Sequence, residues 1–290
     1  MKLGVSLAGG GVKGAAHIGA LKALEEKNIP IDYLSGTSSG SIVTTLYGAG
    51  YSCNEILNIF YEYSKKIKYI DFKNIFNIVK RLVCERKFRI EGFNTGEIIE
   101  NLINKLCNAK NIYNIKDIKR DILIVSVSLN SGKVYFFESN PKESRYSDSI
   151  IHINDINIGR AVRASCSFPG VFCPVNFKND ILVDGGIREN IPWKEAKKSG
   201  IDKVLCIVFE EQKKYKKDKN IIDTISGSIG LMGRELSNYE LDGADYVLKI
   251  CTDEISLLDS SKIDYLYEQG YYQTKSYLGN WKCKENIKNL

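Results

Sequence analysis

The stretch SLAGGGVKGAAHIGAL, residues 6–21, joins an apolar, strand-like run to an alanine-rich, helix-like run through closely spaced glycines. Gly9, Gly11 and Gly14 match the pattern G-x-G-x-x-G letter for letter, and this pattern between a strand and a helix is typical of dinucleotide-binding loops. Glycines let backbone N–H groups turn toward a negative group at the start of a helix. The stretch therefore predicts an anion-binding turn in an α/β fold and leaves open whether the anion is a pyrophosphate.

Strand-like and helix-like runs alternate through the first 50 residues. Residues 2–8 and 31–36 have the apolar composition of short buried strands, while residues 13–28 and 39–50 have the periodicity of helices. This alternation indicates a parallel sheet covered by helices on both faces. Further strand-like runs return at residues 121–130, 133–139, 181–186, 203–210 and 246–250. We therefore expect a three-layer α/β/α fold with a mostly parallel central sheet.

One domain covering residues 1–290 accounts best for this pattern, because neither a repeat nor a low-complexity linker divides the chain. Residues 53–110 are helix-like and uneven in charge. We expect them to form a helical insertion or cap on the domain. A tyrosine-rich run over residues 261–279 predicts a closing helix.

The composition is that of an ordinary globular protein, with 43% hydrophobic and 26% charged residues. A formal net charge of +6 is too small by itself to indicate a nucleic-acid-binding protein, and it is compatible with contact to an anionic membrane. The eight cysteines include no C-x-x-C pair, which favours reduced thiols over a disulfide framework or a metal site. We expect neither a metal nor a cofactor.

The sequence contains no evident targeting segment. The first apolar run breaks at Gly9, before the hydrophobic region of a signal peptide could form. No apolar run approaches the ~20 residues that cross a bilayer. These features favour a cytoplasmic protein, either in solution or peripheral at a membrane.

The motif GTSSG, residues 36–40, is a G-x-S-x-G pattern placed where the second predicted strand runs into the second predicted helix. In this context the central serine stands on a sharp, strained turn with its hydroxyl exposed, and the start of the helix stabilises negative charge there. Ser38 is therefore the candidate nucleophile. An ordinary serine-rich turn is the alternative, since serine and glycine are common.

A serine hydroxyl is a weak nucleophile and needs a base within hydrogen-bonding distance. The chain has two histidines: His17 lies inside the first predicted helix, and His152 lies in a stretch without a motif. The chain also lacks the order Ser, Asp, His that is found in α/β-hydrolases, because no histidine follows residue 152. Structural roles are expected for both histidines, and a Ser-His-Asp triad is not expected.

Asp184 is the best candidate for the base. It ends the apolar run ILVD, and Gly185 and Gly186 after it leave room for another loop to approach. The carboxyl ends of parallel strands are where active sites of α/β folds lie. Aspartate is a poor base in water, but burial raises its pKa, so a partly buried Asp184 is able to accept the proton of Ser38. The alternative is a plain Asp-Gly turn.

Nucleotide binding is the less favoured use of the glycine loop. A dinucleotide site predicts an acidic residue at the end of the second strand, where it would bind a ribose. That strand ends instead in Gly36, Thr37 and Ser38. The loop is not a P-loop either, because Lys13 is followed by Gly14 rather than by Ser or Thr.

Four blocks of the chain resemble the patatin-like phospholipases, which are lipid acyl hydrolases with a Ser–Asp dyad, and they occur in the order of that family. The blocks are GGGVKG at residues 9–14, GTSSG at 36–40, ASCSFPGVF at 164–172 and DGG at 184–186. Four ordered blocks are far more specific than any one of them. Residues 53–110 and everything after Pro192 carry no block that matches the family.

The resemblance implies a role for each matching position. Ser38 would accept the acyl group and Asp184 would be its base. Backbone N–H groups of the loop would hold the oxyanion, and the implied positions are Gly9, Gly10 and Gly11.

The resemblance also implies an acyl-lipid substrate such as a phospholipid. Lys13, at the basic position of the loop, and Ser39, next to the nucleophile, are the candidate substrate-binding residues; a solvated lysine in the first helical turn is the alternative for Lys13. A catalytically silent lipid-binding or scaffolding protein with the same fold is the alternative to an enzyme.

Two basic stretches are candidate contacts with an anionic membrane. Nine basic residues lie between Lys65 and Arg89, where apolar residues recur at helical spacing, as in an interfacial helix. A lysine run lies between Lys213 and Lys219. The alternatives are an ordinary cap helix for the first stretch and a solvated loop for the second.

Overall fold

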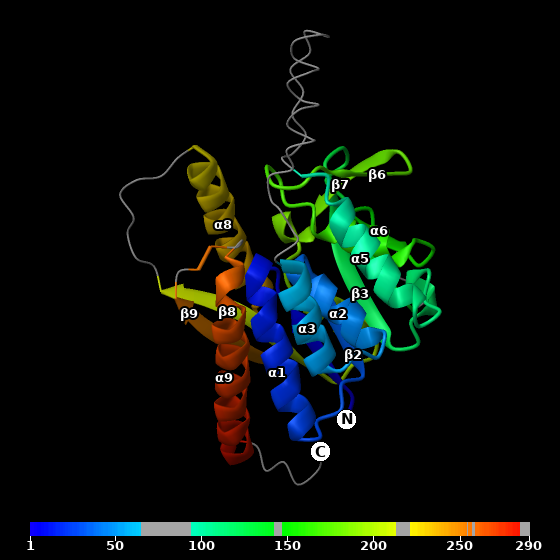
Figure 1. Ribbon diagram of the computed structural model, residues 1–290. Coiled ribbons are helices and arrows are strands. Elements are labelled where there is room, and N and C mark those ends of the chain that lie inside the picture. The colour runs from blue at the N-terminus through cyan, green and yellow to red at the C-terminus, as the bar shows by residue number, and fades with distance from the viewer. Residues whose placement is uncertain (65–93, 142–146, 213–220, 254, 257–258, 285–290) are drawn as a thin grey trace.

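The computed structural model describes residues 1–64, 94–141, 147–212, 221–253, 255–256 and 259–284. Within these ranges nine strands belong to one sheet (Figure 1). The strands are β1 (Leu3–Leu7), β2 (Tyr33–Thr37), β3 (Asp121–Ser128), β4 (Val134–Glu138), β5 (Ile150–Ile153), β6 (Val175–Phe177), β7 (Asp180–Asp184), β8 (Lys203–Gln212) and β9 (Tyr246–Asp253).

The sheet is mostly parallel, as the sequence predicts. Its main strand order is β5-β4-β3-β2-β1-β8-β9. The central pairs β3–β2, β2–β1, β1–β8 and β8–β9 are parallel, while β4 and β7 both run antiparallel to β3 and β6 runs antiparallel to β7. β2 pairs with β3 as far as Val125, and β7 pairs with β3 from Ser126 onward. The end of β2 and the end of β7 therefore meet along the same strand.

Helices cover both faces of this sheet. They are α1 (Gly14–Glu26), α2 (Ser39–Gly48), α3 (Cys53–Ser64), α5 (Glu97–Asn108), α6 (Ile158–Ser165), α7 (Trp193–Lys198), α8 (Ile221–Glu240) and α9 (Ile263–Lys284). Four short 3₁₀ turns lie between these elements, namely η1 (Gly11–Lys13), η2 (Ile115–Asp117), η3 (Gly185–Ile187) and η4 (Ser260–Lys262).

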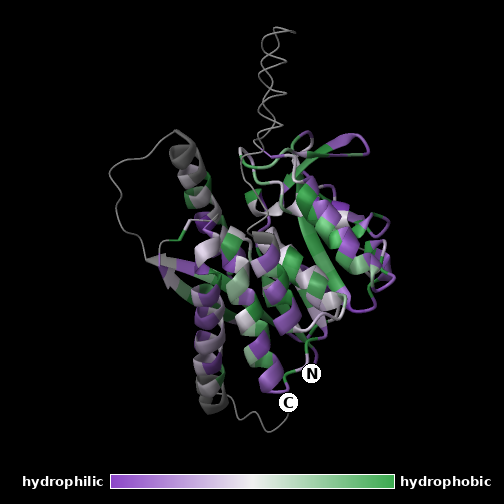
Figure 2. Cartoon of the chain, viewed as in Figure 1, coloured by the Kyte–Doolittle hydropathy of each residue, from purple (hydrophilic) through white to green (hydrophobic). Residues whose placement is uncertain are grey.

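The strands divide their side chains between two hydrophobic cores. In β3, Ile122 and Ile124 point to the core beneath α1, α2, α3, α5, α6 and α9, whereas Leu123 and Val125 point to the core beneath α7. All four side chains are essentially fully buried, and β3 stands out as hydrophobic in Figure 2. This alternation is the packing expected of a sheet buried on both faces, and it confirms the three-layer α/β/α architecture.

The stretch predicted to be an insertion or cap supplies α3 and α5. Ile56 of α3 and Ile103 of α5 are fully buried in the same core as α1 and α2. The described parts of this stretch therefore pack as part of the main core. Residues 65–93 lie outside the described residues, so the predicted single domain with a cap stays a prediction.

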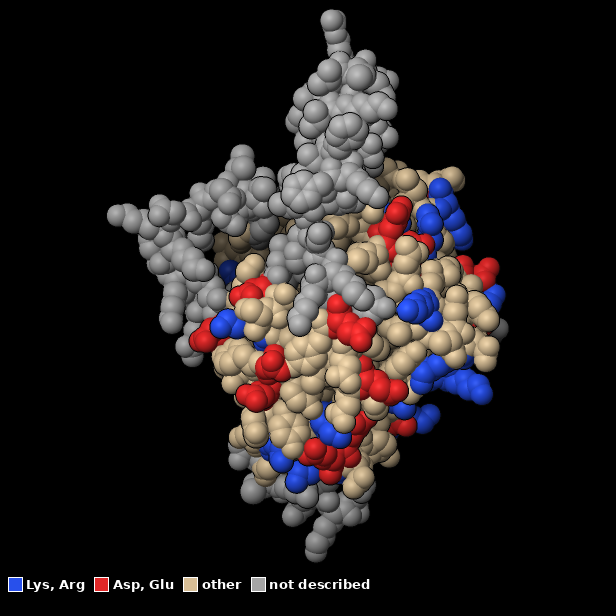
Figure 3. Space-filling view, in the orientation of Figure 1, with Lys and Arg blue, Asp and Glu red and all other residues tan. Residues whose placement is uncertain are grey.

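The surface bears on two further expectations. Figure 3 shows basic and acidic side chains mixed over this face of the described residues, without a large area of one sign. None of the helices within the described ranges combines the length and the hydropathy needed to cross a bilayer. Free thiols within the described residues include Cys53, Cys107, Cys166, Cys173, Cys206 and Cys251.

Candidate active site

Ser38 occupies a strained turn between β2 and α2. Its backbone has φ 53° and ψ −123°, which places a non-glycine residue in the region of positive φ. The glycines on either side of it permit this turn, because a side-chain carbon at Gly36 would overlap the backbone carbonyl of Gly40, and one at Gly40 would overlap the carbonyl of Leu7. Ser38 is half-buried and stands at the start of α2, as the G-x-S-x-G interpretation predicts.

The block at residues 164–172 holds this turn in place. The backbone N–H of Ser38 donates to Oγ of Ser165 at 2.9 Å. The carbonyl of Ser38 accepts from Oγ of Ser41 at 2.6 Å and from Sγ of Cys166 at 3.2 Å. Hydrogen bonds from both sides therefore stabilise the strained backbone, and the sequence had not assigned individual roles to Ser165 or Cys166.

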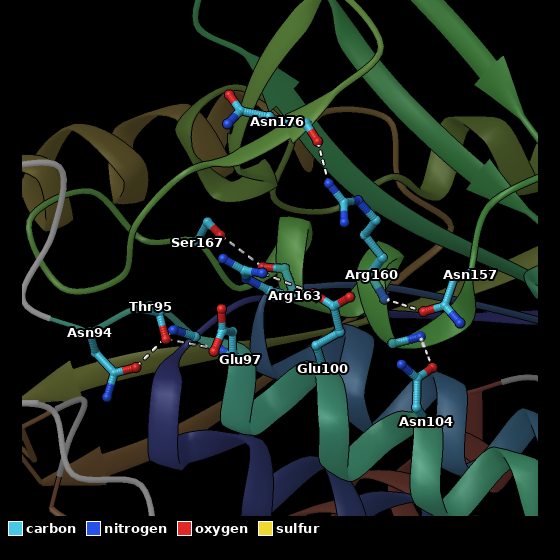
Figure 4. Close-up of polar contacts among 12 residues, drawn as sticks. Asn94, Thr95, Glu97, Glu100, Asn104, Asn157, Arg160, Arg163, Ser167 and Asn176 are labelled. Atoms are coloured by element: carbon cyan, nitrogen blue, oxygen red, sulfur yellow. Dashed lines mark hydrogen bonds and ion pairs between the residues drawn. The ribbon is translucent and has the colours of Figure 1, made fainter. Parts of the chain in front are cut away.

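Polar contacts between α5 and α6 support that block (Figure 4). Nη1 of Arg163 in α6 donates to Oε2 of Glu100 in α5 at 3.0 Å. Oδ1 of Asn104 in α5 accepts the N–H of Gly159 at 3.1 Å, and Oγ of Ser167 donates to the carbonyl of Arg163 at 2.9 Å. Because Ser165 is the last residue of α6 and Cys166 follows it, these contacts position the residues that bind the Ser38 turn.

Asp184 ends β7 and is almost completely buried, with 2% of its surface exposed. Its N–H donates to the carbonyl of Ser167 at 3.0 Å, and its Oδ1 accepts the N–H of Gly186 at 2.9 Å. Burial raises the pKa of the carboxyl to about 6, while the neighbouring Ser38 side chain and the Gly186 N–H lower it by stabilising the charged form. Oδ2 has no partner with hydrogen-bonding geometry within the described residues.

β7 reaches the site in a different way from the one the sequence argument assumed. It runs antiparallel to β3, so Asp184 does not lie at the carboxyl end of a parallel strand. Asp184 pairs with Ser126 of β3. The preceding residue of β3, Val125, pairs with Thr37 at the end of β2. The two strand ends thus bring Ser38 and Asp184 together from opposite directions.

The two histidines have structural surroundings, as expected. His17 is fully buried, its Nε2 lies 2.8 Å from the carbonyl oxygen of Ala8, and its ring packs on Phe209. Burial lowers the pKa of His17 to about 4, so the ring is neutral at physiological pH. His152 lies on β5 and is hydrogen-bonded to Glu138 at 2.8 Å.

The glycine loop runs beside the nucleophile. A side-chain carbon at Gly9 would lie 3.0 Å from Cβ of Ser38, and one at Gly10 would lie 2.6 Å from the ring of Phe209. Gly11 has φ 59°, in the left-handed region that favours glycine. The N–H of Gly9 donates to Oδ1 of Asn190 at 2.8 Å. The loop therefore needs glycine for close approach at two positions and for its turn at a third.

A cavity of about 690 Å³ brings the predicted site residues together. Its wall includes every position predicted from the sequence to act at the site, namely Gly9, Gly10, Gly11, Lys13, Ser38, Ser39 and Asp184. The rest of the lining is largely apolar and comes mainly from α2, α3, α5, α8, β8 and the 166–172 segment. A mostly apolar hollow with a few converging polar groups is typical of a site for a small organic ligand.

Lys13 and Ser39 both line this cavity from buried positions. Lys13 is 4% exposed and Ser39 is 5% exposed. Oγ of Ser39 has no hydrogen-bond partner among the described residues. The two basic stretches predicted to meet a membrane, from Lys65 to Arg89 and from Lys213 to Lys219, lie outside the described residues.

Comparison with known proteins identifies the family of this chain. A model of the patatin-like phospholipase family matches residues 5–197. This chain therefore belongs to the patatin-like phospholipase family, and the resemblance seen in the four sequence blocks is confirmed. Membership supports the hydrolysis of lipid esters as the general class of activity.

Individual relatives fit the same family. The chain is 31% identical over 222 residues to the uncharacterized protein YqhO of Bacillus subtilis, covering 73% of each protein. It is 25% identical over 314 residues to the lysophospholipase NTE1 of Lodderomyces elongisporus, covering 99% of this chain but only 20% of that protein's length. The crystal structure of VipD from Legionella pneumophila shares the fold, with a TM-score of 0.55 and 16% identity over 96% of this chain and 67% of that one.

Proposed function

We propose that this chain is a lipid acyl hydrolase of the phospholipase A or carboxylesterase type, with Ser38 as nucleophile and Asp184 as base. One observation carries the proposal: a serine on a strained turn faces a buried carboxyl at the wall of an apolar cavity. The substrate is a phospholipid or another acyl-lipid, because the lining offers apolar surface for an acyl chain. Neither the substrate nor the reaction requires a cofactor.

The first half of the reaction forms an acyl-enzyme. Oδ2 of Asp184 accepts the proton of the Ser38 hydroxyl while Oγ attacks the ester carbonyl carbon. The carbonyl oxygen becomes an oxyanion, which the N–H groups of Gly10 and Gly11 stabilise, and loss of one such donor costs about 3 kcal/mol. The carbon–oxygen bond to the leaving alcohol then breaks, and that oxygen takes the proton from Asp184.

The second half releases the fatty acid. Asp184 accepts a proton from water, the hydroxide attacks the acyl carbon, and Ser38 leaves with the proton returned by Asp184. Gly9 shapes the loop, since its own N–H is bonded to Asn190. Lys13 and Ser39 bind substrate: the ammonium of Lys13 attracts a phosphate or the oxyanion, and Oγ of Ser39 offers a hydroxyl at the cavity wall.

Delivery of the lipid completes the proposal. The enzyme works in the cytoplasm and binds an anionic membrane peripherally, through the stretch from Lys65 to Arg89 or the run from Lys213 to Lys219. The fatty-acyl chain then enters the apolar part of the cavity. No nucleic acid takes part.

A fluorophosphonate probe tests the dyad directly, because it reacts with an activated serine. Wild type should be labelled, Ser38→Ala should not be labelled, and Asp184→Asn should be labelled at least ~100-fold more slowly. Equal labelling of all three would refute the dyad. Labelling that depends on Ser38, without release of fatty acid from vesicles or short-chain esters, would mean a different substrate class. Absence of labelling in wild type would favour the silent lipid-binding alternative.

A further inference from the structure

The side chain of Asn190 connects three segments of the site that are remote in sequence. Its Oδ1 accepts the N–H of Gly9 at 2.8 Å, across 181 positions of the chain. Its Nδ2 donates to Oγ of Ser237 in α8 at 3.0 Å. Asn190 lines the same cavity as Ser38, and it follows Asp184 by six residues. One amide therefore uses both its acceptor and its donor to join the glycine loop to α8.

This contact determines which N–H groups of the loop remain for a substrate. With its N–H bonded to Asn190, Gly9 is held where a side-chain carbon would come within 3.0 Å of both Asn190 Oδ1 and Ser38 Cβ. Gly10 and Gly11 follow directly and line the cavity. A displacement of Gly9 would move both of them relative to Ser38, because they are its next neighbours in the chain.

Glu240, the last residue of α8, anchors the backbone on either side of the amide. Its carboxylate accepts the N–H of Asn190 at 2.9 Å and the N–H of Ile191 at 3.0 Å. Its carbonyl accepts Nε1–H of Trp193 at 2.6 Å. The segment after Asp184 is therefore bonded to the end of α8 through three groups, which fixes where Asn190 presents its side chain.

We propose that Asn190 is a positioning residue of the oxyanion loop, held in orientation by Ser237 and Glu240 of α8. Asn190 fixes Gly9, and Gly9 places the N–H groups of Gly10 and Gly11 opposite the carbonyl oxygen under attack. The catalytic consequence rests on the hydrolase function proposed above, whereas the bond to the loop stands on geometry alone.

Kinetics of Asn190→Ala test the catalytic consequence. The variant should lose roughly 10–100-fold in kcat with KM for a short-chain ester changed by less than about threefold, because misplacement affects the transition state more than substrate binding. Affinity for a trifluoromethyl ketone, which forms an oxyanion when Ser38 adds to it, should fall by the same factor as kcat/KM. Affinity for a fatty alcohol, which forms no oxyanion, should stay at the wild-type value.

Hydrogen–deuterium exchange tests the bond itself without relying on activity. The peptide containing residues 6–21 should exchange faster in Asn190→Ala and, more weakly, in Ser237→Ala. The matched control is Asn130→Ala, since Asn130 is an exposed asparagine whose Nδ2 donates to the carbonyl of Asn179. This variant should leave both exchange and kinetics unchanged.

The outcomes separate the two proposals. Normal exchange and a kcat within twofold of wild type in folded Asn190→Ala would overturn the positioning role. If Asn190→Ala does not fold, Ser237→Ala carries the same comparison, because it keeps the amide but removes the partner of Nδ2. If wild type reacts with neither ester nor ketone, the hydrolase proposal fails and takes the catalytic consequence with it, while the exchange result still decides whether Asn190 fixes the loop.

Discussion

Ser38 and Asp184 are each held in a state that an isolated residue avoids. Ser38 has a positive φ, and Asp184 carries its carboxyl at a position with 2% exposure. Neighbours compensate only in part: Ser165 accepts the Ser38 N–H and Gly186 donates to Oδ1, yet Oδ2 has no such partner among the described residues. Unfavourable states of this kind are common where a protein holds reactive groups ready.

The raised pKa of Asp184 predicts the pH dependence of activity. The carboxylate must be ionised to accept the proton of Ser38, and its pKa in the folded protein is about 6. Ester hydrolysis should therefore rise about tenfold per pH unit below 6 and level off above about 7. The measurement is kcat/KM from pH 3.5 to 8, with the released acid quantified by chromatography. A half-maximum near 4, the ordinary range of an exposed aspartate, would contradict it.

The raised pKa of Asp184 also makes the stability of the folded protein depend on pH, in the opposite direction to activity. A carboxyl whose pKa is raised by folding contributes stability that is fully present below its unfolded value, near 4, and that is lost as pH rises through about 6. Asp184→Asn removes this charge. The variant should melt near the wild-type temperature at pH 4 and above it at pH 8, so thermal melts at these two values are the control for the activity profile. A variant that melts lower than wild type at pH 8 would argue against a buried, ionised Asp184.

Sequence patterns identified the residues whose roles depend on local context. Ser38 was predicted because a strand, a turn and a helix lie within a few residues of it, and the structure places it at such a turn. Asn190 was not predicted, because its partner Gly9 lies 181 positions away and no local pattern distinguishes it from an ordinary turn asparagine. Contacts of that range arise only when the sheet brings strand ends together.

At the scale of elements, the direction of β7 shows where sequence reasoning reached its limit. An apolar strand followed by glycines was recognised, but strand direction depends on which neighbour supplies the hydrogen bonds. β7 pairs with the last residues of β3, from Ser126 to Ser128, where β2 no longer pairs with β3. This part of β3 is therefore open to an antiparallel strand. The parallel strands β1, β2 and β3 were predictable because helices separate them in the sequence.

The contact between α1 and α9 yields a prediction at this scale. A side-chain carbon at Gly270 in α9 would overlap the carbonyl of Ala16 in α1, so Gly270→Ala should destabilise the protein by about 1–3 kcal/mol through overpacking. Gly279, in the same helix, has no neighbour among the described residues within 4 Å of the equivalent position. Gly279→Ala is the matched control and should stabilise the helix by up to about 1 kcal/mol. Chemical denaturation measures both, and equal changes in the two variants would refute the close contact.

At the scale of the whole molecule, the cavity is formed by segments that span most of the chain. The reactive groups come from the ends of β2 and β7 and from the loop after β1, while α8 supplies one wall and α2, α3 and α5 supply another. The sequence patterns held no signal for this division, since apolar residues of α3 and α5 have the same periodicity whether they face a core or a cavity. The structure assigns Phe60 and Leu102 to the cavity lining.

That assignment predicts how chain-length preference is set. Leu102 of α5 lines the cavity, so Leu102→Trp should fill part of the apolar space and reduce kcat/KM for a long-chain ester by about tenfold or more, with little effect on a four-carbon ester. Leu106 lies one turn further along α5, is partly buried and is not part of the lining. Leu106→Trp therefore controls for the general effect of a large side chain on this helix. The measurement is the ratio of kcat/KM for the two esters in each variant. If both variants change the ratio equally, or neither does, the acyl chain does not occupy the space between α3 and α5, and the wall formed by α8 becomes the place to look for it.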